Sequence, residues 1–163
     1  MAYLSNEVPY DENTVENLPE SWIENIKTDP HIKFFENRNI SRYINGKTVY
    51  NKEIVYFFED VDAISLKGII ITTHGKNICG YAALKNERDN TINDGYFLGN
   101  IKDIKNTSFD EAIAYWVEEL NTCDLCHESV GYGNLNRYSF AGKCCTKCLP
   151  AARAKYEQPG WYN

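Results

Sequence analysis

Two closely spaced pairs of cysteines constrain this chain more than any other feature of its sequence. Cys123 and Cys126 form one C-x2-C pair, and after 18 further residues Cys145 and Cys148 form a second. Each pair fits a tight turn that directs two sulfurs toward one ion, and two such pairs at this separation are typical of a tetrahedral zinc site. The sequence therefore predicts one structural Zn²⁺ ion, because four thiolates leave no open coordination position.

The redox environment decides whether such cysteines bind metal or form disulfides. Five of the six cysteines fall within the last 41 residues. The N-terminus shows neither the basic nor the apolar region of a secretory signal, and the longest strongly apolar run, residues 68–71, is far shorter than the roughly 20 residues of a membrane helix. We therefore expect a cytoplasmic protein with reduced thiols, which favours metal binding.

Two neighbouring residues offer alternative ligands. Cys144 could pair with Cys148 in a C-x3-C arrangement, but Cys145 is preferred because the two-residue spacing forms the usual turn. His127 directly follows Cys126 and could replace one thiolate. Cys79 lies far from both pairs in a predicted strand, where we expect it to be a small buried apolar side chain.

The residues around the cysteines resemble a known family of zinc modules. Glycines and asparagine at positions 131–134 favour turns, residues 137–140 favour a strand, and residues 149–157 favour a helix whose first turn would carry the second cysteine pair. A turn, a hairpin and such a helix resemble the treble-clef zinc fingers. Residues 139–163 are also similar to zinc modules of small tailed-phage proteins, which implies a phage-encoded protein in the host cytoplasm.

The pattern of the first 120 residues predicts an α+β fold. Apolar residues at helical spacing predict helices over residues 19–29 and 108–120, the second beginning with a capping box of Ser108 and Glu111. β-Branched and aromatic runs predict strands, with a polar loop at 86–94; the strands are at 48–50, 54–58, 63–73, 77–84 and 95–99. We predict an antiparallel sheet with one buried face and packed helices in residues 1–120, followed by the zinc module in residues 121–163.

Charge is distributed unevenly between these two parts. The chain has 17 basic and 23 acidic residues, a formal −6, of which residues 1–120 account for −8 and residues 121–163 for +2. Such an acidic protein is not expected to coat duplex DNA through its phosphates. The basic residues of the tail alternate with aromatic residues, which suit a protein interface or stacked single-stranded bases. The candidate binding residues are Arg137, Tyr138, Phe140 and Lys143.

The catalytic motifs in the sequence are incomplete. Residues 45–48 lack the first glycine and the following helix of a phosphate-binding P-loop. The cysteine segment lacks the histidines of HNH nucleases in its hairpin and helix, and the chain lacks the His-x-Glu of zinc deaminases. Residues 75–84 resemble a central strand of GNAT acetyltransferases, although the glycine loop and helix of that family are missing.

These observations favour a non-enzymatic zinc-binding interaction protein, a regulator or phage-encoded inhibitor that acts on a host protein. Two alternatives stay open: a single-stranded nucleic-acid-binding protein that works through the zinc module, and an acyltransferase-like enzyme.

Overall fold

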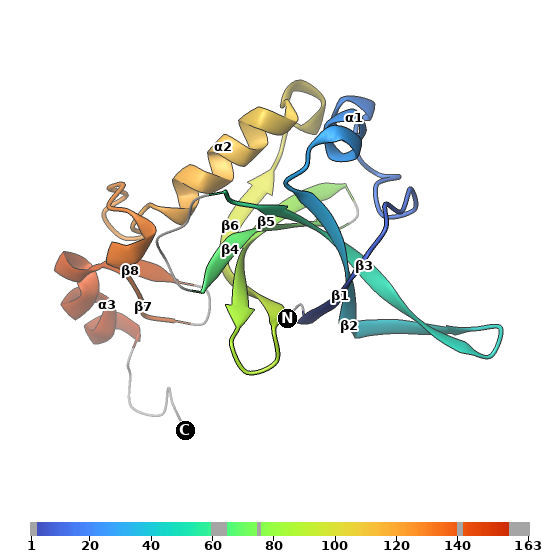
Figure 1. Ribbon diagram of the computed structural model, residues 1–163. Helices are drawn as coiled ribbons and strands as arrows, with labels where there is room; N and C mark the ends of the chain where they lie inside the picture. The colour runs from blue at the N-terminus through green and yellow to red at the C-terminus, as the bar shows by residue number, and fades with distance from the viewer. Residues whose placement is uncertain (1–2, 60–64, 75, 140–141, 157–163) are drawn as a thin grey trace.

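A closed barrel of six antiparallel strands forms the body of the protein (Figure 1). The computed structural model describes residues 3–59, 65–74, 76–139 and 142–156. Each strand pairs with the next along the chain, and the last returns to the first through Leu4 and Ile92. The strands are β1 (Tyr3–Val8), β2 (Ile32–Ile44), β3 (Lys47–Phe57), β4 (Leu66–His74), β5 (Asn77–Asn86) and β6 (Thr91–Ile101).

The predicted α+β class, an antiparallel sheet with one buried face and packed helices, is wrong. Neighbouring residues of a strand point to opposite faces, and in β4 both faces are apolar and buried: Ile69 and Ile71 contact the outer core, whereas Ile70 belongs to a second cluster. That second cluster takes side chains from all six strands, so it fills the barrel interior: Leu4, Phe35, Val55, Ile70, Ala83 and Ile92. Burial on both faces fits a closed wall.

The predicted polar loop at residues 86–94 is also wrong in its second half. β6 begins at Thr91, and Ile92 pairs with Leu4 of β1. The residues that close the barrel therefore lie in a stretch whose polar composition indicated a loop.

Two helices cover the outer face of the barrel, α1 (Glu20–Thr28) and α2 (Phe109–Leu120), and both were predicted from the sequence. A short 3-10 turn, η1 (Ile104–Asn106), precedes α2, and the predicted capping box of Ser108 and Glu111 is present. The rings of Trp22 and Trp116 are fully buried and pack edge to face, with their centres 6.3 Å apart. Among the described residues, no helix is long and apolar enough to cross a membrane.

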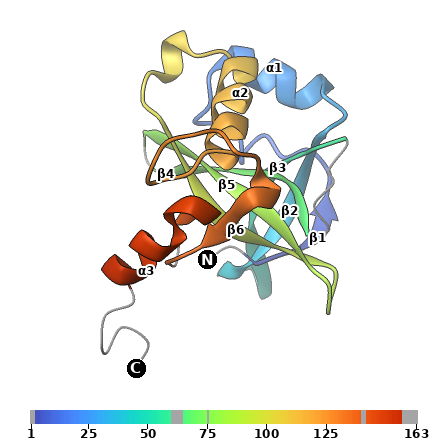
Figure 2. The same cartoon turned by 90° about the vertical axis from the view of Figure 1, so that its left-hand side faces the viewer.

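The cysteine module follows α2 directly and lies at the C-terminal end of that helix (Figures 1 and 2). Its two-stranded sheet is separate from the barrel. The centres of the Tyr132 ring and of the Tyr96 ring on β6 are 6.0 Å apart, and this contact joins the module to the barrel. The elements of the module are η2 (Tyr132–Asn134), β7 (Leu135–Arg137), β8 (Lys143–Cys145), η3 (Thr146–Cys148) and α3 (Leu149–Tyr156).

A histidine between two carboxylates gives the fold a predicted dependence on pH. His31 Nδ1 lies 2.7 Å from Asp29 Oδ1, and its Nε2 lies 2.7 Å from Glu59 Oε1. Hydrogen bonds to Asp29 and then to Glu59 raise the pKa of His31 above its usual 6.5. Because the folded state favours the protonated ring, the stabilisation is fully present below the usual pKa and is lost as the pH rises through the raised pKa.

We therefore expect His31→Asn to lower the melting temperature in mildly acidic solution and to have little effect in mildly alkaline solution. Thermal unfolding of both proteins across this pH range measures the difference. A loss of stability that is the same at every pH would contradict the assigned role of the protonated ring.

Candidate metal centre

The four cysteines of the two C-x2-C pairs meet in one cluster. The Sγ atoms of Cys123, Cys126, Cys145 and Cys148 all lie within 4.8 Å of one another. The Cys126 and Cys145 sulfurs are 3.8 Å apart. Zinc–sulfur bonds of about 2.3 Å in a tetrahedron place the sulfurs ~3.8 Å apart. The cluster therefore fits a tetrahedral thiolate site and could hold a metal ion such as zinc.

The first pair lies on a turn whose backbone points toward sulfur. The N–H groups of Leu125 and Cys126 donate to Cys123 Sγ at 3.4 and 3.5 Å. The N–H of His127 donates to the carbonyl oxygen of Cys123 at 2.9 Å and closes the turn, with His127 at φ 62°. Since N–H donors stabilise a negative charge, this turn is suited to a sulfur in its thiolate form.

The thiols of the cluster differ in acidity. Burial opposes ionisation of Cys123, but the N–H donors of Cys126, Cys145 and Leu125 outweigh it and lower the pKa of this thiol to about 6. Burial and the three neighbouring thiols raise the pKa of Cys148 to about 12. Metal binding would remove this difference, because each ligand must be deprotonated to bind, and the protons are released when the metal enters.

The structure brings Cys145, rather than Cys144, to the other three sulfurs. Both lie on β8, where adjacent side chains point to opposite faces, so only one of them can face the ion. Cys144 is fully buried, and burial raises the pKa of its thiol. His127 is exposed and does not join the cluster. The geometry thus favours the C-x2-C pair of Cys145 and Cys148 over the C-x3-C alternative with Cys144.

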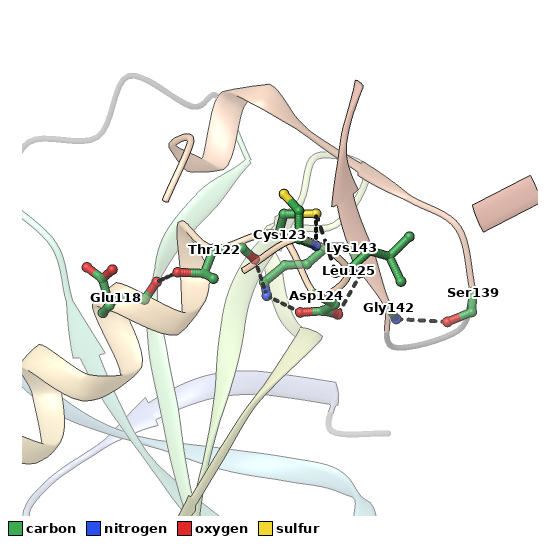
Figure 3. A network of polar contacts seen from close by, with 9 residues as sticks. Glu118, Thr122, Cys123, Asp124, Leu125, Ser139, Gly142 and Lys143 are labelled. Carbon is green, nitrogen blue, oxygen red and sulfur yellow. Dashed lines mark hydrogen bonds and ion pairs between the residues drawn. The ribbon is translucent and has the colours of Figure 1, made fainter. Parts of the chain in front are cut away.

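An ion pair between a buried lysine and a half-buried aspartate connects the two cysteine turns (Figure 3). The Lys143 ammonium donates to Asp124 Oδ1 at 2.8 Å and to the carbonyl oxygen of Thr122 at 2.9 Å, and the Lys143 N–H donates to Asp124 Oδ2 at 3.0 Å. Only 1% of Lys143 is exposed. Asp124 lies inside the first C-x2-C pair and Lys143 lies two residues before Cys145, so the pair fixes the position of one turn relative to the other.

The other candidate binding residues lie in different environments. The Arg137 guanidinium lies 5.0 Å from the centre of the Tyr96 ring, at the contact between module and barrel. Tyr138 is half-buried against the core of the module. Phe140 lies outside the described residues. The structure therefore places Lys143 in the interior, whereas Arg137 stays exposed beside the Tyr96 ring, and binding of a partner by this set stays a prediction.

The apolar core of the module is very small. Apart from cysteines, it contains one fully buried alanine and a few half-buried side chains: Ala152, Leu125, Val130, Leu135, Tyr138 and Leu149. A segment with so few apolar residues cannot bury enough surface to offset its conformational entropy. The free energy of metal binding would therefore supply most of the folding energy of the module.

Comparison of the chain with protein-family models, with curated proteins and with solved structures gave no match. The assignment of the metal centre consequently depends on its own geometry. The resemblances to treble-clef fingers and to zinc modules of phage proteins gain no support from these comparisons.

Proposed function

We propose that the chain is a non-enzymatic binding protein, a regulator or inhibitor that acts by occupying a surface of another macromolecule, with one structural Zn²⁺ ion in its cysteine cluster. The observation that carries this proposal is the closed ligand set. Four sulfurs would fill the four positions of a tetrahedron; Cys123 and Cys145 are 0% and 6% exposed, and Cys126 and Cys148 are half-buried. Catalytic zinc sites instead combine three protein ligands with an open position for water or substrate.

Two other features support binding over catalysis. Cys79 is buried, its thiol donates to Asn100 Oδ1 at 2.6 Å, and burial raises its pKa, all of which oppose a reactive thiolate. The strand that resembles part of an acetyltransferase, β5, pairs with β4 and β6 and leads into β6 rather than into a helix.

Cobalt substitution tests the structural role of the ion. We expect elemental analysis to find about one zinc per chain, and the Co²⁺ form to show the visible bands of a tetrahedral tetrathiolate complex. Because no coordination position is open, azide and imidazole should leave this spectrum unchanged. A spectrum that shifts with either ligand would reveal an exchangeable position and would contradict the proposal.

Single-stranded nucleic-acid binding through the zinc module has less support. One of its four candidate residues, Lys143, is buried and paired with Asp124, and Arg137, although exposed, lies over the Tyr96 ring. A cellular protein partner also stays a prediction.

A further inference from the structure

The hairpin of β2 and β3 extends well beyond the barrel. Residues 38–52, here called the arm, lie beyond the last contact of β2 with β1 at Asn37 and before the first contact of β3 with β4 at Ile54. Residues 38–48 are exposed without interruption. In Figure 1 the arm projects from the side of the barrel opposite the zinc module. No residue of the arm belongs to either barrel core, so the stability of the barrel does not account for the length of the arm.

The arm is basic in an acidic protein. It contains Arg38, Arg42, Lys47 and Lys52 and no acidic residue before Glu53, which separates it from Ile54, whereas the remaining 13 basic and 23 acidic residues give the rest of the chain −10. Lys52 forms an ion pair with Asp11 at 2.7 Å. Within the described part of the chain, no ion pair involves Arg42 or Lys47. Two cations at the outer part of the arm are therefore available to an anionic partner.

The two faces of the arm carry different chemistry. Arg42 pairs across the strands with Val49, and Lys47 pairs with Ile44, so these two cations share one face. Tyr43 pairs with Thr48 on the other face, and 77% of Tyr43 is exposed. Farther down, the Arg38 guanidinium lies 5.8 Å from the centre of the Tyr50 ring. Exposed tyrosine and arginine beside free cations are the groups on which unpaired bases stack.

A polar cleft of about 450 Å³ opens at the foot of the arm. Its lining includes the cations Arg42 and Lys52, the carboxylates of Asp11 and Glu53, and amides and hydroxyls of Asn13, Asn17, Asn51, Thr72 and Thr73. Amides and hydroxyls can both donate to and accept from base edges. The cleft thus continues the charged and aromatic surface of the arm toward the barrel.

The distance of the arm from the acidic body limits repulsion. Lys47 lies four residues along β3 from Asn51, the partner of Asn37, and at about 3.4 Å per residue the tip lies roughly 14 Å beyond the last contact of β2 with β1. This exceeds the Debye length of ~10 Å at 0.1 M salt. The negative charge of the body therefore weakens the attraction of Lys47 for phosphate only slightly, whereas Arg42 lines the cleft with Asp11 and Glu53.

We propose that the arm binds single-stranded nucleic acid, with Arg42 and Lys47 on the phosphates and Tyr43 stacked on a base. A duplex keeps its bases stacked and offers none to Tyr43. A standard interface between folded proteins needs roughly 20–30 residues on each side, whereas a single strand follows a narrow track of about 4–16 nucleotides. This inference rests on the proposed function only in treating the chain as a binding protein.

Fluorescence anisotropy with labelled oligonucleotides tests the arm. The zinc-loaded protein is titrated into oligo-dT, oligo-rU and a mixed-sequence duplex of about 20 nucleotides, and into labelled poly-glutamate. We expect Tyr43→Ala to weaken single-strand binding about 5- to 150-fold, as one lost stack implies. Arg42→Glu/Lys47→Glu should weaken it at least tenfold and reduce the salt slope by about 1.4, the value for two phosphate contacts.

Lys102→Glu/Lys105→Glu is the matched control. Both lysines are exposed near the β6–α2 connection, and the double change alters the net charge by the same amount. This variant should bind single strands as the unchanged protein does. The inference is overturned if no single strand binds at low salt, if the control weakens binding equally, or if duplex or poly-glutamate binds as well and independently of Tyr43. Each of these outcomes would leave the cobalt spectrum unchanged, so the proposed function would not be affected.

Discussion

Replacing Cys145 by serine is expected to remove the metal and to unfold the module while the barrel stays folded. Metal binding supplies about 10–16 kcal/mol of folding energy in zinc-finger peptides, and the core of this module is too small to compensate. The two barrel clusters contain none of the four ligands. We expect the zinc content to fall from about one per chain to near zero, and amides of residues 122–156 to lose protection from hydrogen exchange while β1–β6 keep theirs.

Cys144→Ser is the matched control, because the two cysteines are neighbours on β8 and are both buried. Its sulfur lies outside the cluster, so this variant should retain zinc and lose about 1–3 kcal/mol of stability. Retention of zinc by Cys145→Ser together with loss by Cys144→Ser would mean that Cys144, rather than Cys145, is the fourth ligand. Loss of zinc from neither variant would contradict the assignment of the site.

The elements of the fold that carry a local signal could be predicted from the sequence. α2 follows from its apolar spacing and from Ser108 with Glu111, and the β4–β5 hairpin follows from two apolar runs around residues 74–76. Closure of the barrel could not be predicted, because it depends on the pairing of Leu4 with Ile92 from opposite ends of the barrel sequence. No periodicity encodes such a contact.

The arm was missed although a signal for it exists. Asn45 and Gly46 both have positive φ, 51° and 80°, and Asn-Gly between two strands is the strongest local signal of a tight hairpin. The same residues, 45–48, also match part of a P-loop, which obscures the hairpin signal. The strand before them, in β2, could not be recognised because residues 38–48 are exposed on both faces, so apolar and polar residues do not alternate there. Of the strand after them, residues 48–50 carry the β-branched and aromatic signal that predicts part of β3.

The ligand set could be predicted from the sequence, whereas the contacts that support it could not. Spacing alone identifies the four cysteines that meet in the structure. Lysine is almost never fully buried unless it is paired, so Lys143 was assigned to a binding surface. Its partner, Asp124, lies in the two-residue gap of the first pair, where sequence patterns assign no role.

The largest effect expected in the barrel comes from Trp116→Ala. Trp116 is fully buried between α2 and the barrel, and its Nε1 donates to the carbonyl oxygen of Gly99 at 3.0 Å. Loss of a buried aromatic ring costs about 3–5 kcal/mol. Urea unfolding followed by circular dichroism measures this loss. Tyr115→Ala, on the same helix but 42% exposed, should cost only about 1 kcal/mol, and equal losses would contradict the burial assigned to Trp116.

Gly80 provides a sharper test of how the Trp116 ring packs. A Cβ atom added at Gly80 would lie 2.6 Å from three atoms of that ring, so Gly80→Ala should cost about 1–3 kcal/mol through overpacking. In the Trp116→Ala background the ring is absent and the added methyl occupies part of the cavity, so the same change should be neutral or stabilising. A double-mutant cycle over the four proteins should therefore give a coupling energy of about 1–3 kcal/mol. Additive losses would mean that the Trp116 ring does not lie against Gly80 and that the outer core packs differently around α2.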